Sequence, residues 1–189
     1  MALINAVMTT PAATAADLSH AAANVDTIAH ALVGDREPST APRLERNHGD
    51  YLPRSPVVGA ASPLAPGTFA WDIVDGRFVA TGLLTAAYEG PPGFVHGGMI
   101  ALVFDEILGI VNIANGCPGM TGTLNIKYRQ PTPLYRPLRW EAWIDQRIGR
   151  RVMSHARVRD GETLCAEASG VFVELSAELR RRHFGDAAG

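Results

Sequence analysis

One segment of the chain, from Glu89 to Glu106, has residue types and spacings that suit chemistry: EGPPGFVHGGMIALVFDE. Gly97 and Gly98 lie where a long apolar helix is expected to begin, and the first N–H groups of a helix have no partner inside it. Glycine has no side chain, so a ligand atom can come close to these donors, where the helix dipole favours negative charge. The pattern predicts an oxyanion hole for a carbonyl oxygen. The alternative is that the two glycines only allow a tight backbone turn.

Asp105 is the candidate acid or base. It lies in the middle of the apolar segment, where an unpaired ionised carboxylate is costly, so Asp105, Glu106 or both are expected to face a polar pocket. The alternative is a carboxylate that caps or bridges backbone groups at a subunit interface. Nine residues separate His96 from Asp105, which is about 13 Å along a helix axis and half a turn round it. The two side chains therefore cannot meet in one chain, and a shared site would lie between two subunits.

Two further side chains are candidates beside this segment. His96 precedes the helix and can donate to a substrate or hold the glycine loop, although a lone histidine is more often structural. Thr121 is in phase with Thr123 and Asn125 of the following strand. Its hydroxyl can serve a water or a substrate, unless Thr121 is simply a good strand residue.

The elements that must position these residues form an antiparallel α+β sheet around one helix. Residues 95–114 are apolar on nearly every side, which is typical of an enclosed helix. Before it, FAWDIV, an Asp75-Gly76 turn and RFVATGLL indicate a hairpin. After it, strands are expected at 123–129, 138–145, 152–159 and 163–175. Without βαβ alternation, the pattern favours five to six antiparallel strands curled around the helix, with dimerisation along a sheet edge.

The N-terminal part of the chain differs from the rest. Residues 13–33 carry one apolar stripe at helical spacing, and Thr14 with Asp17 resembles a capping box, with Gly34 suited to the helix end. Such a helix must dock on the main domain or on another subunit. Six prolines in residues 36–67 favour an extended connector over a surface. We therefore divide the chain into a helix and proline-rich connector at 1–67, a main domain at 68–175 and a C-terminal tail at 176–189.

Composition excludes several classes of protein. The 189 residues are 47% hydrophobic and carry a net charge of −2, which allows one domain with an appendage and disfavours nucleic-acid binding. Two cysteines suit a reducing compartment, and the first basic residue is Arg36, unlike a signal peptide, so we expect a cytoplasmic protein. The longest apolar segment contains two carboxylates, so no membrane span is expected. Metal-binding, nucleotide-binding and G-x-S-x-G motifs are absent.

The motifs GPPGFVHGGMIALVFDE, TGTLNIKYRQPTPL and DGETLCAEASGVFVEL together resemble the hotdog-fold acyl-CoA thioesterases of the 4-hydroxybenzoyl-CoA thioesterase superfamily. The resemblance covers about residues 68–175. Within the superfamily, the motifs are most similar to the branch that contains the phenylacetate-pathway and long-chain acyl-CoA enzymes. It implies hydrolysis of a fatty or aromatic acyl-CoA to free acid and CoA without a cofactor or metal. It also implies a homodimer, or a dimer of dimers, with the active site between subunits.

The resemblance assigns roles residue by residue. Asp105 corresponds to the family's carboxylate, as general base on water or as nucleophile, and Gly97 or Gly98 to the N–H that polarises the thioester carbonyl. His96 corresponds to the family's histidine, and Thr121 to a threonine that helps to hold the water. The position at which many relatives have asparagine is Gly90 here. The remaining candidates for binding the substrate are Glu89 and three arginines that suit CoA phosphates or else form a solvated turn: Arg147, Arg150 and Arg151.

Two other functions fit the same motifs. A hotdog protein that binds an acyl thioester as a sensor or carrier would keep the HGG element without needing the carboxylate. A hydratase or dehydratase of this fold usually places its histidine and acid in another local pattern. A purely structural protein would give no reason for Asp105 inside an apolar helix.

Overall fold

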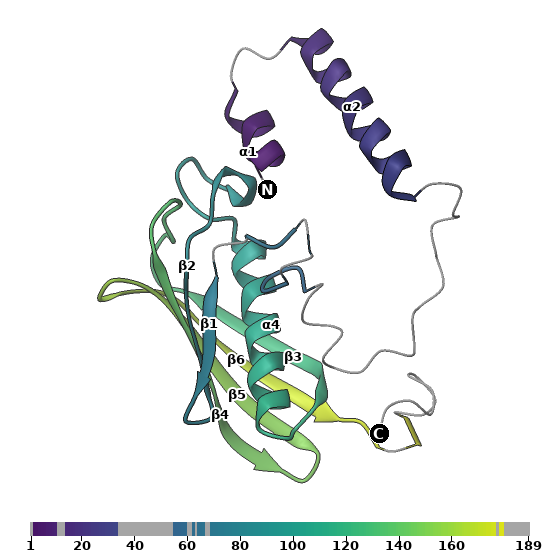
Figure 1. Cartoon of the computed structure of the whole chain (residues 1–189). Helices are drawn as coiled ribbons and strands as arrows, with labels where there is room; N and C mark the ends of the chain where they lie inside the picture. The colour runs from purple at the N-terminus through teal and green to yellow at the C-terminus, as the bar shows by residue number, and fades with distance from the viewer. Residues whose placement is uncertain are drawn as a thin grey trace.

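The computed structural model describes residues 2–10, 14–33, 55–59, 62, 64–66, 69–176 and 178–179. Within them, one six-stranded antiparallel sheet has the order β1-β2-β4-β5-β6-β3 and curls around the helix α4, as Figure 1 shows. The elements are β1 (Ala70–Val74), β2 (Arg77–Gly82), α4 (Gly97–Ala114), β3 (Gly119–Tyr128), β4 (Leu138–Ile148), β5 (Arg151–Asp160) and β6 (Thr163–Glu174). The predicted antiparallel sheet around one central helix is confirmed.

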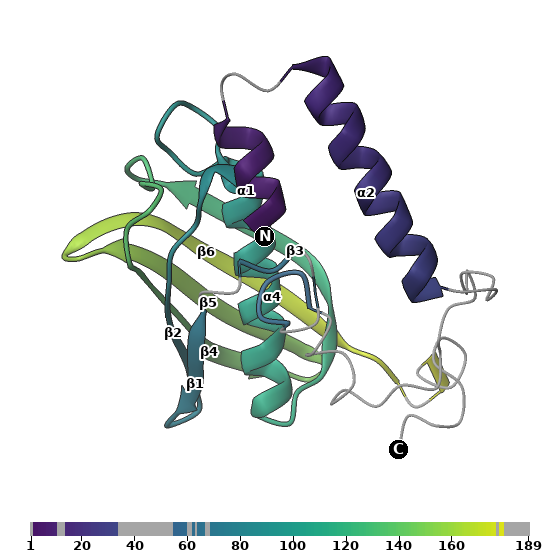
Figure 2. The same cartoon turned by 45° about the horizontal axis from the view of Figure 1, so that its top comes forward.

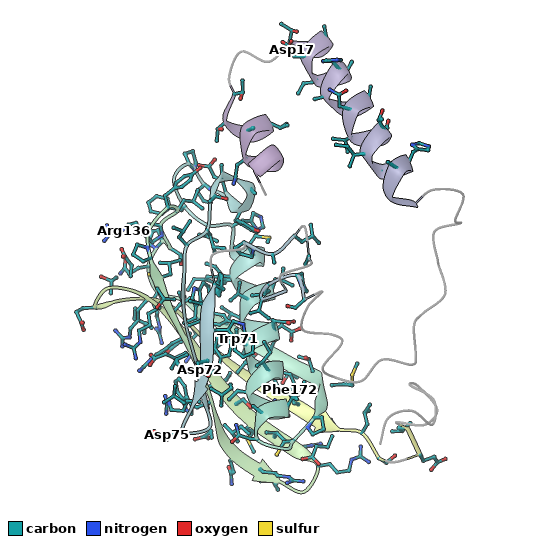
Figure 3. The ribbon with its side chains drawn as sticks, viewed as in Figure 1. Asp17, Trp71, Asp72, Asp75, Arg136 and Phe172 are labelled. Atoms are coloured by element: carbon teal, nitrogen blue, oxygen red, sulfur yellow. The ribbon has the colours of Figure 1, made fainter. Side chains whose placement is uncertain are left out.

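The strands differ from the sequence prediction mainly at their ends. The β1–β2 hairpin turns at Asp75 and Gly76, whose φ angles are 49° and 72°. Both angles suit the tight turn that an Asp-Gly pair favours, and Figure 3 shows Asp75 at its tip. At the other side of the sheet, β4 continues through a register shift between Ile144 and Gln146 and stays paired with β5. The expected arginine-bearing turn is therefore only two residues long, and two of its three arginines belong to strands.

The core lies between the sheet and α4. Trp140 of β4 and Phe104 of α4 are fully buried, and their ring centroids are 5.6 Å apart in an edge-to-face arrangement. Aromatic pairs favour this geometry, and such contacts explain why an apolar helix is held in the curl of the sheet. Among the described residues, α4 is the one helix with the length and hydropathy of a membrane span, and here it is this core helix.

The expected enclosure of α4 is incomplete, which corrects the sequence prediction. A stripe along one side of the helix keeps solvent exposure; we call it the uncovered stripe, and it consists of Gly98, Leu102, Asp105, Gly109 and Ile113. The physical reason is the strand order: β3 is an edge strand, paired with β6 alone, so no further strand among the described residues covers that side of α4. Two of its five residues, Leu102 and Ile113, have apolar side chains, and Asp105 is the candidate carboxylate.

The described part of the proline-rich segment joins the core instead of only crossing the surface. Val57 is 1% exposed, and the Ser55 hydroxyl accepts hydrogen bonds from the N–H groups of Val57 and Val58, both at 3.1 Å. The Tyr88 hydroxyl donates to the carbonyl of Leu64 at 2.7 Å. Gly34, the connector from 36 to 54 and the tail beyond 179 lie outside the described residues, so the proposed division of the chain stays a prediction.

The predicted N-terminal helix is α2 (Ala15–Val33), and its capping box is confirmed. The Thr14 N–H donates to Asp17 Oδ2 at 2.9 Å, and the Asp17 N–H donates to Thr14 Oγ1 at 3.2 Å. These are the two reciprocal bonds of a capping box, and Figure 3 shows Asp17 at the start of the helix. Nearly all side chains of α2 are exposed, Leu18 and Ile28 included, and Figures 1 and 2 show the helix apart from the sheet. Its apolar stripe therefore has no partner among the described residues of this chain.

A second N-terminal helix, α1 (Ala2–Thr9), was not predicted from the sequence. It lies against the short 3-10 helix η2 (Ala86–Tyr88) that precedes the HGG segment. Asn5 Oδ1 accepts a hydrogen bond from Thr85 Oγ1 at 2.8 Å, which ties the two helices together. The N-terminal region thus contacts the main domain through α1. Of the two expected partners of the longer helix α2, the main domain of the same chain is not in contact with it among the described residues, and docking on another subunit stays a prediction.

One face of the sheet contains a buried carboxylate, Glu141, whose ion pairs with two partly exposed arginines should stabilise the fold. Glu141 accepts hydrogen bonds from Arg157 Nε at 2.6 Å and from an Arg139 guanidinium nitrogen at 3.1 Å, with its own side chain 8% exposed. Burial raises the pKa of Glu141, but the bonds and charges of the two arginines outweigh it and hold the pKa below its ordinary value. Because the folded-state pKa is the lower one, the stabilisation is present above the unfolded pKa and is lost as the pH falls through the folded pKa.

We therefore expect Glu141→Gln to lower the free energy of unfolding by about 1–2 kcal/mol at neutral pH, and by less below about pH 4. Urea unfolding of the wild type and the variant, at neutral pH and again below about pH 4, measures this difference in the free energy of unfolding. The matched control is Glu167→Gln, which breaks the exposed 2.6 Å pair with Arg129. An exposed pair contributes little, so the control should cost under about 1 kcal/mol. Equal losses in the two variants would contradict the prediction.

Candidate active site

His96 is the N-cap of α4 and accepts two of the four N–H groups that a helix start leaves free, those of Gly98 and Met99, as well as the first ordinary helical bond, from Ile100. Its backbone is extended, with φ −61° and ψ 132°, and its ring Nδ1 accepts the Gly98 N–H at 2.9 Å. Its carbonyl accepts the N–H groups of Met99 at 2.9 Å and Ile100 at 3.3 Å. Of the four donors that a helix start leaves free, only the Gly97 N–H makes no hydrogen bond with the described residues.

The hydrogen bond from Gly98 decides the tautomer of His96. A ring nitrogen that accepts a hydrogen bond carries no proton, so the neutral ring carries its proton on Nε2. His96 is exposed, and Nε2 makes no hydrogen bond with the described residues, so this Nε2–H is open to a ligand. The helix start thus presents two donors, one from the backbone and one from a side chain.

The two glycines differ in how much room each leaves for a side chain. A Cβ at Gly98 would lie 3.1 Å from Nδ1 and 3.2 Å from Cε1 of His96, so a side chain there would push the capping ring away. A Cβ at Gly97 would meet only the Tyr128 hydroxyl and ring, at 3.4 Å or more, which is ordinary contact. The chain itself therefore explains the glycine at 98, whereas the contact at Gly97 would tolerate a Cβ next to the free donor.

The loop before α4 is held by backbone bonds on both sides. The His96 N–H donates to the Tyr88 carbonyl and the Val95 N–H to the Thr132 carbonyl, both at 2.8 Å. A Cβ at Gly90 would lie 2.7 Å from the His96 Cα atom, so this loop has no room for an asparagine at 90. In this chain an asparagine donor at position 90 is therefore excluded, and the open donor that the structure shows beside this loop is the Gly97 N–H.

Glu89, the neighbouring candidate for binding the substrate, has a role inside the loop. Its Oε1 accepts the Gly93 N–H at 2.7 Å and so closes the turn between them. A contact with a substrate stays a prediction for this exposed side chain.

Asp105 is positioned by β3. Thr121 Oγ1 donates to Asp105 Oδ1 at 2.8 Å, while Oδ2 makes no hydrogen bond with the described part of the chain. Asp105 is partly exposed on the uncovered stripe, whereas Glu106 is buried at 9% exposure. Of the two adjacent carboxylates, Asp105 is the one that can reach a ligand, and Thr121 orients it.

No hydrogen bond joins Asp105 to His96, both of them described residues, as the helix spacing predicted. His96 lies at the first turn of α4 and Asp105 two turns further along, beside the exposed edge strand β3. A single chain therefore presents the donors and the carboxylate as two separate half-sites, about two turns of α4 apart.

The three arginines lie at the other end of the sheet from His96. Arg147 Nε is 2.9 Å from Glu174, and Glu174 pairs with Gly119 at the start of β3. Arg150 is in the β4–β5 turn and Arg151 begins β5, both exposed. Their contact with CoA phosphates stays a prediction.

Sequence reasoning missed Tyr128, the last residue of β3. Its hydroxyl donates to the Gly97 carbonyl at 2.9 Å, although 31 residues separate them. Tyr128 and Gly97 also line an open groove of about 530 Å³ together with Phe94, Arg129 and Thr132. The available signal was the T-x-x-L-x-x-x-Y pattern, which puts Tyr128 on the helix-facing side of its strand beyond two apolar residues.

Within the described residues, no three His, Cys, Asp or Glu side chains are grouped as metal ligands would be. Both cysteines, Cys117 and Cys165, are buried and free. The polar groups of the candidate site thus fall into two sets: the Asp105 carboxylate with the Thr121 hydroxyl, and, at the start of α4, the His96 imidazole with the open Gly97 N–H.

A curled antiparallel sheet around one long helix, with open donors at the helix start and a carboxylate two turns later, defines a hotdog-fold protein. The model of the thioesterase superfamily matches residues 92–167, from the HGG loop to the middle of β6. The crystal structure of protein RHA08564, a thioesterase superfamily protein, is 32% identical, with a TM-score of 0.79 over 91% of this chain and 85% of that chain. This chain belongs to the thioesterase superfamily.

Two further comparisons bear on the fold and on the site segment. Acyl-coenzyme A thioesterase THEM4 of Mus musculus is 36% identical over 92 residues, which are 48% of this chain and 40% of that protein. The chain thus aligns with less than half the length of this curated relative. A hypothetical thioesterase protein from Streptococcus pneumoniae TIGR4, solved with coenzyme A, has 20% identity and a TM-score of 0.53 over 56% of this chain and 86% of that chain. That likeness supports the fold.

Proposed function

We propose that the protein is an acyl-CoA thioesterase that hydrolyses a fatty or aromatic acyl-CoA to the free acid and CoA. The observation that carries the proposal is the single open N–H of Gly97 at the start of α4, on a molecule whose Asp105 keeps a free carboxylate oxygen among the described residues. The name of THEM4 as an acyl-coenzyme A thioesterase and the coenzyme A in the Streptococcus pneumoniae structure support the substrate class.

In the proposed reaction the thioester carbonyl oxygen accepts hydrogen bonds from the Gly97 N–H and the His96 Nε2–H. Asp105 Oδ2 takes a proton from a water molecule as the water oxygen bonds to the carbonyl carbon. The negative charge that develops on the carbonyl oxygen is stabilised by the two donors and by the helix dipole. When the intermediate collapses, the C–S bond breaks and the sulfur of CoA receives the proton from Asp105. One water is consumed, and one acid and one thiol are formed.

Thr121 fits this role for Asp105 as a base. Its hydroxyl occupies Oδ1 at 2.8 Å, which fixes the carboxylate and leaves Oδ2 for the water. If Asp105 were instead the nucleophile, Oδ2 would attack the carbonyl carbon and a mixed anhydride would form. Both routes need the same free oxygen, and the base route needs no covalent intermediate.

The complete site would combine two copies of the chain. A homodimer along the β3 edge would cover the uncovered stripe and bring Asp105 of one subunit to His96, Gly97 and Gly98 of the other. Of the three arginines, Arg150 and Arg151 make no ion pair with the described residues, so they suit CoA phosphates better than Arg147 does. Pairing of two dimers is a further part of the proposal. The two buried free thiols support a cytoplasmic location.

The test is thiol release from a panel of acetyl-, hexanoyl-, lauroyl-, palmitoyl- and phenylacetyl-CoA by the full-length chain. We expect turnover of about 1 per second or faster on at least one member of the panel. Thermal shift with the same compounds measures binding independently. A clear stabilisation by acyl-CoA without thiol release would refute hydrolysis and leave a binding protein.

A further inference from the structure

We infer that Tyr128 is a positioning residue that prepares His96 for the thioester carbonyl through the Gly97–Gly98 peptide group. The inference rests on the proposed function, which it deepens by adding a residue of β3 to the donor half-site. It is carried by a continuous chain of hydrogen bonds that begins at the tyrosine hydroxyl and ends at the imidazole.

The chain of hydrogen bonds has two links. The Tyr128 hydroxyl donates to the Gly97 carbonyl at 2.9 Å. That carbonyl belongs to the same peptide group as the Gly98 N–H, which donates to His96 Nδ1 at 2.9 Å. The hydroxyl, the peptide group and the imidazole therefore lie in series.

Each link strengthens the next. A donor on a peptide carbonyl draws electron density from the peptide nitrogen, so its N–H becomes a better donor, by about 10–30% per bond in condensed-phase estimates. A stronger bond from Gly98 to Nδ1 holds the ring in place and fixes the neutral tautomer with its proton on Nε2. It also withdraws density from the ring, which makes the Nε2–H a better donor to a carbonyl oxygen.

Within one chain, the hydrogen bond to Gly97 is the specific contact that the structure gives Tyr128. Its exposure in the single chain is 54%, and it borders the open groove beside Gly97. The same strand holds Asp105 through Thr121, so β3 is bonded to α4 at two points. On one chain, the Asp105 carboxylate and the donors at the start of α4 are thus both oriented by hydroxyl groups of β3.

The first test compares two Tyr→Phe substitutions, each of which removes one hydroxyl group. Tyr128→Phe is expected to lower kcat about tenfold on the best substrate of the panel while KM stays within about twofold, because the lost bond serves the transition state. The control is Tyr135→Phe: Tyr135 is 56% exposed, and its hydroxyl accepts a backbone N–H, from Ala86 at 3.0 Å, away from α4. We expect kcat of this control within about twofold of wild type. Equal kcat for both variants would overturn the inference.

The second test asks whether Tyr128 acts through His96. In a His96→Ala variant the imidazole at the end of this series of hydrogen bonds (the relay) is missing. Adding Tyr128→Phe to that variant should therefore change kcat by less than about twofold. A full tenfold further loss in the double variant would overturn the relay, because the two residues would then act independently.

A third measurement does not depend on hydrolysis. Nitrogen NMR of the ring at about pH 8, where an ordinary imidazole is neutral, should show Nδ1 of His96 unprotonated in the wild type. In Tyr128→Phe the signals should move toward a mixture of the two tautomers. Unchanged signals would overturn the inference even in a protein that hydrolyses acyl-CoA. Conversely, the expected shift in a protein without thiol release would reject the proposed function and leave the relay standing.

Discussion

Asp105→Asn is expected to lower kcat by about 10²–10⁴-fold on every acyl-CoA that the wild type hydrolyses. The amide of asparagine cannot take a proton from water, yet it has the size of the carboxyl group and its oxygen can still accept the Thr121 hydroxyl. Helix, strand and subunit packing should therefore be preserved. Thiol release gives kcat, and light scattering on the same sample shows whether the oligomer has assembled.

The neighbouring carboxylate provides the control for Asp105. Glu106→Gln makes the same chemical change one residue later, on a side chain that is buried away from the uncovered stripe. Its effect is expected in the unfolding temperature and not in the kcat of the folded fraction. A correctly assembled Asp105→Asn protein that hydrolyses at near the wild-type rate would contradict the assignment of Asp105 as base.

Local signals in the sequence predicted the elements well because they depend on neighbouring residues. The Thr14 and Asp17 capping box, the Asp75-Gly76 turn and the strand alternation all follow from spacings of a few residues, and the structure confirms them. The strand ends were less accurate, because β4 is prolonged by pairing with β5 across a register shift. That pairing depends on a partner strand and not on the residues of β4 alone.

The contacts that orient the site could not be predicted from the sequence. Thr121 bonds to Asp105 across 16 residues and Tyr128 bonds to Gly97 across 31, so both bonds depend on β3 lying beside α4. That placement follows from the strand order, in which β3 pairs with β6 and forms an edge. The same order leaves one side of α4 uncovered, although its composition alone indicates a helix enclosed on all sides.

The HGG motif shows the same limit at the scale of single atoms. In the sequence, Gly97 and Gly98 are equivalent candidates for the carbonyl donor. In the structure the Gly98 N–H is taken by His96, so the free donor belongs to Gly97. The distinction depends on the orientation of the His96 ring, which cannot be predicted from the spacing of residues. It also makes the N–H group of Gly97 a target that a single substitution can test.

Gly97→Pro is expected to lower kcat by about 10²–10³-fold, because proline removes this N–H, the backbone donor of the proposed oxyanion hole. The fold should tolerate the change. Gly97 is the first residue of α4, the position that proline favours in helices. The preceding His96, with its ψ of 132°, already has an extended conformation. A residue before proline adopts that conformation. The measurement is kcat with the unfolding temperature as the check on folding.

Gly97→Ala is the matched variant, because it adds a side chain and keeps the N–H. Its Cβ would make only ordinary contact with Tyr128, at 3.4 Å or more. We therefore expect a loss of less than about tenfold in kcat. If alanine and proline reduced kcat equally, crowding at position 97 and not the missing N–H would be the cause, and the donor assignment would fail.

The same proline variant tests whether the site lies between subunits. In a mixed dimer of an Asp105→Asn chain and a Gly97→Pro chain, a shared site would contain either both changes or neither. A mixture of the two chains, unfolded and refolded together at equal amounts, should therefore recover about a quarter of the wild-type rate, since half of the dimers are mixed and each has one intact site. Sites confined to single chains would all carry one lesion, and the mixture would stay as slow as its two parents.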